Sequence, residues 1–176
     1  MITLFLKKNI IIGLTLIVLI LLGAFTPYKK SLVFEFQNSG QVLAYLPFAD
    51  KQKFQIKYTH SIHLTDVVES YKVNSNQKIQ QYELMYENFS IGMPSNADEG
   101  EEFEVKDGKY FIKNMKRVFP FFDLRIGKVR ANHTVIYQDM QYPLARYIEP
   151  GTRVRIKIRT LNFVQQMKGV NILEHE

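Results

Sequence analysis

The residue types most capable of chemistry lie in one short stretch, where His60 and Ser61 end a predicted strand and Glu69 lies in the next. A histidine, a serine and a carboxylate are the ingredients of nucleophilic catalysis. If the residues between them form a hairpin turn, residues 58–61 and 69–71 can lie side by side. Adjacent residues of a strand, however, point to opposite faces of a sheet. This argues against a serine activated directly by His60, and we expect a structural role at a strand end or contact with a ligand.

Metal binding is the second chemistry to weigh, because His60 and His63 stand close to Asp66 and Glu69. Their spacing matches no closed zinc pattern, and a third firm ligand is missing. The acidic residues 98–102 lack the alternating ligand register of an EF-hand loop. We therefore expect no metal site and no cofactor, and a solvated loop at residues 98–102.

Gly92, Met93 and Pro94 form a sharper local feature inside a long loop at residues 90–102. Glycine permits positive φ and proline fixes the backbone, so the trio predicts a defined bend. Long loops on a β scaffold are common places for binding. The bend is therefore either a rigid turn or part of a binding surface.

Aromatic residues cluster beside a second bend, at residues 117–122. We interpret them mainly as core, with an exposed docking patch as the alternative.

Four basic residues, Arg153, Arg155, Lys157 and Arg159, alternate along a predicted strand and so share one face of it. This face is either solvated or a surface for anionic headgroups or an acidic partner. Without Lys7 and Lys8, 21 of the 23 basic residues remain against 17 acidic ones, a net charge of +4. That charge is mild and no nucleic-acid-binding motif is present, so we expect no nucleic-acid partner.

The elements that must position these residues are strands. From Ser31 onward the hydrophobic period is two, and turn signals recur. Residues 37–40 and the Asp107-Gly108 pair are hairpin turns by their chemistry. The pattern predicts an all-β domain, an antiparallel β-sandwich or a barrel-like form of it. Strands are expected at residues 32–36, 42–46, 54–58, 67–73, 79–89, 103–105, 110–112, 124–126, 134–137 and 154–158.

The first residues differ from the rest, because residues 10–25 form an uncharged apolar run flanked by lysines. We expect a short basic flank at residues 1–9, a transmembrane anchor at 10–26 and an extracytoplasmic β domain at 27–176. Cleavage after Gly23 or Ala24 would put Leu21 or Leu22 at the −3 position, which disfavours a signal peptide, the alternative, relative to an uncleaved single-pass anchor. The chain has no cysteine, which excludes disulfides and thiolate chemistry.

Three blocks, Tyr58-Thr59-His60-Ser61-Ile62, Val67-Val68-Glu69 and Gly92-Met93-Pro94, together resemble a bacterial family of unknown function. Its members read roughly Tyr-x-His-Ser-Val, Pro-Val-x-Glu and Gly-x-Gly-Met-Pro, and the resemblance spans residues 54–158. Here Asp66 stands where the family commonly has proline, and Ile91 where glycine is more usual. The resemblance carries over to His60, Ser61, Glu69, Gly92, Met93 and Pro94 as candidate ligand- or partner-binding residues.

Genes of that family often neighbour tripartite ATP-independent periplasmic (TRAP) transporters of the TAXI subclass. The resemblance therefore implies a membrane-anchored accessory role beside a transporter permease or its solute-binding protein. Two alternatives stay open: an envelope hydrolase that uses His60, and a structural envelope protein that binds an anionic polymer or lipid.

Overall fold

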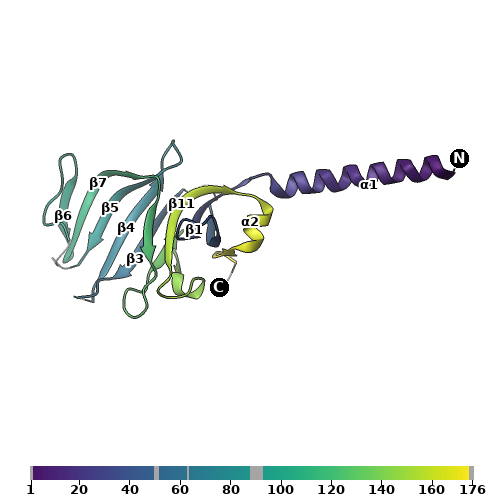
Figure 1. Ribbon diagram of the computed structural model, residues 1–176. Helices are drawn as coiled ribbons and strands as arrows, with labels where there is room; N and C mark the ends of the chain where they lie inside the picture. Colours follow the sequence, from purple (N-terminus) through teal and green to yellow (C-terminus); the bar gives the residue numbers. More distant parts are fainter. Residues whose placement is uncertain (1, 50–51, 63, 88–92, 175–176) are drawn as a thin grey trace.

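The computed structural model describes residues 2–49, 52–62, 64–87 and 93–174, with side chains from residue 9 onward. Helices stand at the two ends of the described chain, and strands fill what lies between them (Figure 1). The elements are α1 (Ile2–Phe25), β1 (Lys29–Phe36), β2 (Val42–Pro47), β3 (Lys53–Thr59), β4 (Asp66–Val73), β5 (Ile79–Tyr86), β6 (Glu102–Lys106), β7 (Lys109–Phe119), β8 (Phe122–Arg125), β9 (Thr134–Tyr137), β10 (Met140–Pro143), the 3₁₀ turn η1 (Leu144–Arg146), β11 (Arg153–Leu161), α2 (Phe163–Lys168) and β12 (Val170–Asn171).

The strands form two sheets, which confirms a β-rich domain of the sandwich kind. Sheet A has the order β12-β2-β1-β11-β8, and sheet B has the order β10-β9-β3-β4-β5-β7-β6. Neighbouring strands are antiparallel, with β12 running parallel to β2. In Figure 1, β5, β7 and β6 of sheet B lie at the end of the domain away from α1, and β1 and β11 of sheet A lie nearer to it.

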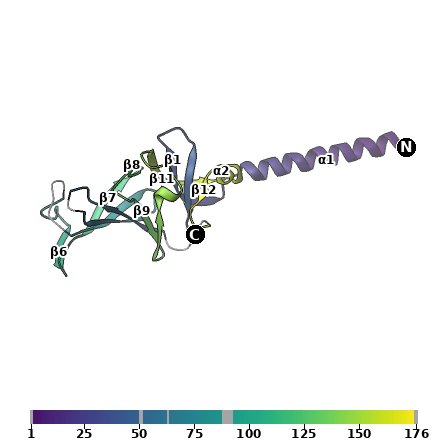
Figure 2. The same ribbon diagram turned by 90° about the horizontal axis from the view of Figure 1, so that it is seen from below.

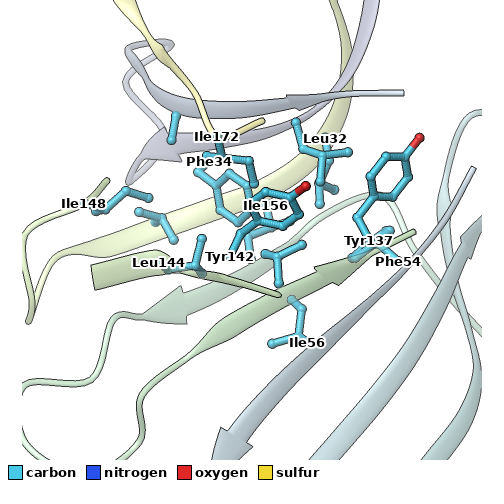
Figure 3. Close-up of a cluster of buried hydrophobic side chains, with 14 of the residues drawn as sticks. Leu32, Phe34, Phe54, Ile56, Tyr137, Tyr142, Leu144, Ile148, Ile156 and Ile172 are labelled. Carbon is cyan, nitrogen blue, oxygen red and sulfur yellow. The ribbon is translucent and has the colours of Figure 1, made fainter. Parts of the chain in front are cut away.

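The two sheets share one core, because alternate residues of each point toward the other. Leu32 and Phe34 of β1 and Ile156 of β11 are fully buried from sheet A, and they meet Phe54 and Ile56 of sheet B (Figure 3). Burying each such side chain stabilises the fold by about 1.5–3 kcal/mol. This layer fixes how the sheets face each other.

Sheet B also has a second cluster of buried residues, at Val67, Leu84, Tyr86, Ile112 and Met115. Met93 and Ala97, from the loop before β6, pack against this cluster. The loop therefore contributes to the packing of sheet B.

The outer side of sheet A is covered near the C-terminus. Val33, Val42 and Tyr45 form a small cluster with Leu161, and α2 lies against β2. A methyl group added at Gly169 would come within 2.7 Å of Val42 Cγ1, so only glycine lets the chain pass this close. Figure 2 shows α2 and β12 beside the end of α1.

Helix α1 ends at Phe25 and is joined to the domain by hydrogen bonds. The Tyr28 amide donates to the Leu161 carbonyl at 3.0 Å, and Asn162 Nδ2 donates to the Phe25 carbonyl at 3.2 Å. Within the helical residues whose side chains the structure describes, no segment is both long enough and apolar enough to cross a membrane.

The hairpin predictions are confirmed. β1 pairs with β2 across residues 37–40, and β6 pairs with β7 across Asp107 and Gly108, whose φ angles are +52° and +74°. Both positive angles match a turn that only such residues form readily. By contrast, β10, β12 and the six-residue α2 were not predicted, and β7 extends to Phe119 through a bulge near Asn114, where φ is +61°.

Candidate functional site

Glu69 lies in a cavity of about 340 Å³ on the inner face of sheet B. β8, the edge strand of sheet A, bounds this cavity through Phe122 and Leu124, because sheet B extends past sheet A at this point. The lining residues are Ile56, Tyr58, Glu69, Tyr71, Gln81, Phe119, Phe122, Asp123, Leu124 and His133. They come from β3, β4, β5, β7, β8 and the loop before β9, so the cavity exists only in the folded domain.

The Glu69 carboxylate is held by its neighbour on the same face of β4. The Tyr71 hydroxyl donates a hydrogen bond of 2.7 Å to Glu69 Oε2. Burial raises the pKa of Glu69, and the hydrogen bond from Tyr71 opposes part of that rise. Burial likewise raises the pKa of Tyr58 to about 12, and the negative charge of Glu69 adds to it. Both phenols are therefore neutral donors beside a carboxyl group that titrates above its usual range.

His133 forms another part of the wall and was not predicted as a site residue. Its Nδ1 accepts a hydrogen bond of 3.1 Å from the Gly127 amide, and its ring lies 5.6 Å from that of Tyr58. Burial lowers the pKa of His133, so the neutral imidazole is favoured. No local motif surrounds His133 in the sequence, and only the pairing of β9 with β3 brings it to Tyr58.

His60 and Ser61 lie outside the cavity, at the turn between β3 and β4. The His60 amide donates to the Thr65 carbonyl at 2.8 Å, and its Nδ1 accepts from the Ile62 amide at 3.3 Å. Thr59 pairs with Asp66 and Ile56 pairs with Glu69, so the expected juxtaposition of residues 58–61 with 69–71 is wrong. Three further residue pairs separate Glu69 from the turn, and the ingredients of a hydrolase do not converge.

Met93 and Pro94 lie on the same face of sheet B as Glu69, farther from the core between the sheets. The Pro94 carbonyl accepts a hydrogen bond from the Tyr86 hydroxyl, and Met93 packs against the cluster that also contacts Tyr58. Tyr58 thus lies between this loop and the cavity. Gly92 and His63 lie outside the described residues.

The loop that follows carries acidic residues, and two of them are paired instead of solvated. Arg117 Nη2 lies 2.7 Å from Asp98 Oδ2 and 3.4 Å from Glu101 Oε2. These ion pairs tie the loop to β7 and so help to hold Met93 in place.

The four alternating basic residues of β11 do share one face, as predicted, but two carboxylates lie among them. Glu35 is 2.6 Å from Lys157 Nζ and 3.1 Å from Arg159 Nη1. Asp123 is 2.8 Å from Arg155 Nε and 3.1 Å from Arg153 Nη2. Half of the positive charge of this face is therefore balanced within the protein, which weakens the case for an anion-binding surface.

The aromatic residues near the second bend divide between two roles. Phe119 and Phe122 pack against the core and line the cavity, as the core interpretation predicts. Phe121 is 40% exposed, and the guanidinium of Arg155 lies 3.7 Å from its ring centroid. The bend at Pro120 therefore directs neighbouring rings to opposite sides.

Comparison with known proteins adds one finding. Residues 54–144 match the family described as Domain of unknown function (DUF1850), and every residue that lines the cavity lies inside this segment. No curated protein and no solved structure matches the chain. Because the match covers more than half of the 176 residues, the chain belongs to the DUF1850 family.

Proposed function

We propose that this chain is a membrane-tethered, extracytoplasmic accessory protein that binds a small ligand and assists a solute transporter of the TRAP-TAXI kind. The observation that carries the binding role is the cavity around Glu69. Concave sites with mostly apolar walls and a few convergent polar groups are the usual form of small-ligand sites. A buried titratable group with a raised pKa adds weight to this interpretation.

The apolar side chains of α1 support the tether. Ile10, Leu14, Ile17 and Ile20 are each more than half exposed, and water is a poor surrounding for so large an apolar surface. Phe163 of α2 is also exposed, at 51%, close to the end of α1. Aromatic residues at this position suit the headgroup level of a bilayer.

The association with a transporter is supported by the resemblance in the His60, Glu69 and Met93 blocks. A tether confines the domain to the membrane surface, where its effective concentration near a membrane-bound partner is high. Even a weak interface with a permease or a solute-binding protein would then suffice. Met93 and Pro94, beside the cavity, are the residues we expect nearest to such a partner.

The test is purification of the tagged full-length chain from its native membranes in gentle detergent, followed by mass spectrometry. We expect a transporter permease or solute-binding protein to be recovered with it. A matched preparation would carry Ile17→Arg and Ile20→Arg, which should move the chain to the soluble fraction and abolish recovery of the partner. Recovery of the wild-type chain with no transporter subunit would contradict the proposal.

A further inference from the structure

The walls of the Glu69 cavity have a charge opposite to that of the protein. The chain has a formal net charge of +6, yet no lysine or arginine is among the residues that line the cavity. Its two acidic residues are Glu69 and Asp123, and Asp123 is already paired with Arg153 and Arg155. Glu69 is the acid left to meet a ligand.

Within the described parts of the chain, no basic side chain forms an ion pair with Glu69. His133 lines the same cavity, but burial lowers its pKa and favours its uncharged form. A carboxylate without a cationic partner in a desolvated site is costly, and a cation from outside the protein relieves that cost.

Aromatic rings surround the acid. Tyr58, Tyr71, Phe119 and Phe122 all line the cavity. Tyr71 and Phe122 stack with their centroids 5.2 Å apart, and Phe119 meets Phe122 edge-on at 6.4 Å. The face of each ring carries negative charge density, which attracts cations, and quaternary ammonium groups are recognised in this way.

We propose that this cavity binds a small organic cation, an ammonium or quaternary ammonium compound whose charge lies between the Glu69 carboxylate and the aromatic rings. The proposal rests on the ligand-binding role proposed above and names the class of ligand. At about 340 Å³ the cavity is near the lower end of the volumes of ligand pockets, which suits a compound of a few carbon atoms.

The other ligand classes fit less well. An anion would meet an acid and no compensating base, and a neutral compound would leave the carboxylate desolvated without a counter-charge. A cation favours the ionised form of Glu69, whereas burial alone raises its pKa. Cation binding therefore releases a proton wherever Glu69 is protonated beforehand.

The experiment is calorimetric titration of the full-length protein in detergent with four probes. Choline and tetramethylammonium are the cations, neohexanol is the neutral isostere of choline with carbon in place of nitrogen, and succinate is the anion. We expect the cations to bind at least about tenfold more tightly than neohexanol, and succinate not to bind. Equal binding of choline and neohexanol, binding of succinate, or binding of none of the four would overturn the proposal.

Two pairs of variants locate the site. Glu69→Gln removes the charge but keeps the shape, whereas Glu83→Gln changes an acid on the neighbouring strand that does not line the cavity. Phe122→Leu removes a ring of the cavity, and Phe121→Leu removes the adjacent ring, which contacts Arg155 instead. We expect about tenfold weaker choline binding in Glu69→Gln and in Phe122→Leu, and little change in the two controls.

The outcome separates this proposal from the accessory role. A transporter subunit that co-purifies with a chain that binds no cation would contradict the ligand class alone. Cation binding by a chain that recovers no transporter subunit would contradict the accessory role alone. A melting curve of each variant shows whether the fold is intact, and unchanged choline affinity in a folded Glu69→Gln variant would refute the assignment.

Discussion

Tyr71 donates a hydrogen bond of 2.7 Å to Glu69, two residues away on the same face of β4. A strand places residues i and i+2 on one side, so this pair is local in sequence. Its surroundings are not local, since Phe54 stacks on one side of the Tyr71 ring at 5.3 Å and Phe122 on the other at 5.2 Å. The stack fixes the hydroxyl, and the hydroxyl in turn orients the carboxylate into the cavity.

Tyr71→Phe should therefore destabilise the domain by about 1–2 kcal/mol, the usual cost of losing a hydrogen bond to an acidic group. The pKa of Glu69 should rise further, because the hydrogen bond from Tyr71 now lowers it. Denaturant unfolding and an NMR titration of the Glu69 carboxyl would measure the two effects. Tyr28→Phe, at a tyrosine that is 59% exposed, is the control and should change neither.

Glu69 should make the free energy of unfolding depend on pH in an unusual direction. Its folded pKa lies above the ordinary value of 4.5, so its contribution is complete below that value and is lost as pH rises through the folded pKa. Glu69→Gln should remove this loss and make the protein more stable than wild type at neutral pH. Unfolding curves at acidic and neutral pH test this, and a variant less stable than wild type at neutral pH would speak against it.

Glu35 should show the opposite dependence. Burial raises its pKa, but hydrogen bonds from Lys157 and the Gly40 amide, with the charges of Lys157 and Arg159, lower it overall. Its contribution to stability is present above the ordinary value of 4.5 and is lost as pH falls through the folded pKa.

Glu35→Gln should cost about 2 kcal/mol at neutral pH, because it leaves two half-buried cations without their partner. Glu87→Gln breaks an exposed pair with Lys109 and should cost less than about 1 kcal/mol. Comparable losses in the two variants, measured by denaturant unfolding, would show that Glu35 is only a surface charge.

Ile156→Ala tests the core between the sheets. Ile156 is fully buried, opposite Phe34 of β1 and Phe122 of β8, so the lost methylene groups leave a cavity worth about 2–5 kcal/mol. Val129→Ala, at a residue that is 88% exposed, should be nearly neutral. Thermal unfolding of the two variants measures the difference. A loss below about 1 kcal/mol at Ile156 would mean that the sheets do not share this layer.

Alternation and turn chemistry predict most of the strands. Residues 32–36 and 154–158 alternate in the sequence and form β1 and β11, which pair in register. Asp107-Gly108 predicts its hairpin because few residues accept positive φ. Elements of few residues, such as β12 and α2, leave no period to detect. Asn162 caps α2 by accepting a hydrogen bond from the Gln165 amide at 2.8 Å, a signal too short to distinguish from a turn.

The candidate site divides along the same line. The sequence by itself determined the β-rich class, the basic face of β11 and the interest of Glu69, because these depend on residue type and on a period of two. Only the tertiary structure decided that Glu69 faces Tyr58, Phe122 and His133, while His60 and Ser61 lie at a turn. The reason is register: which residues meet across strands depends on pairings between segments far apart in the chain, and no local pattern encodes them.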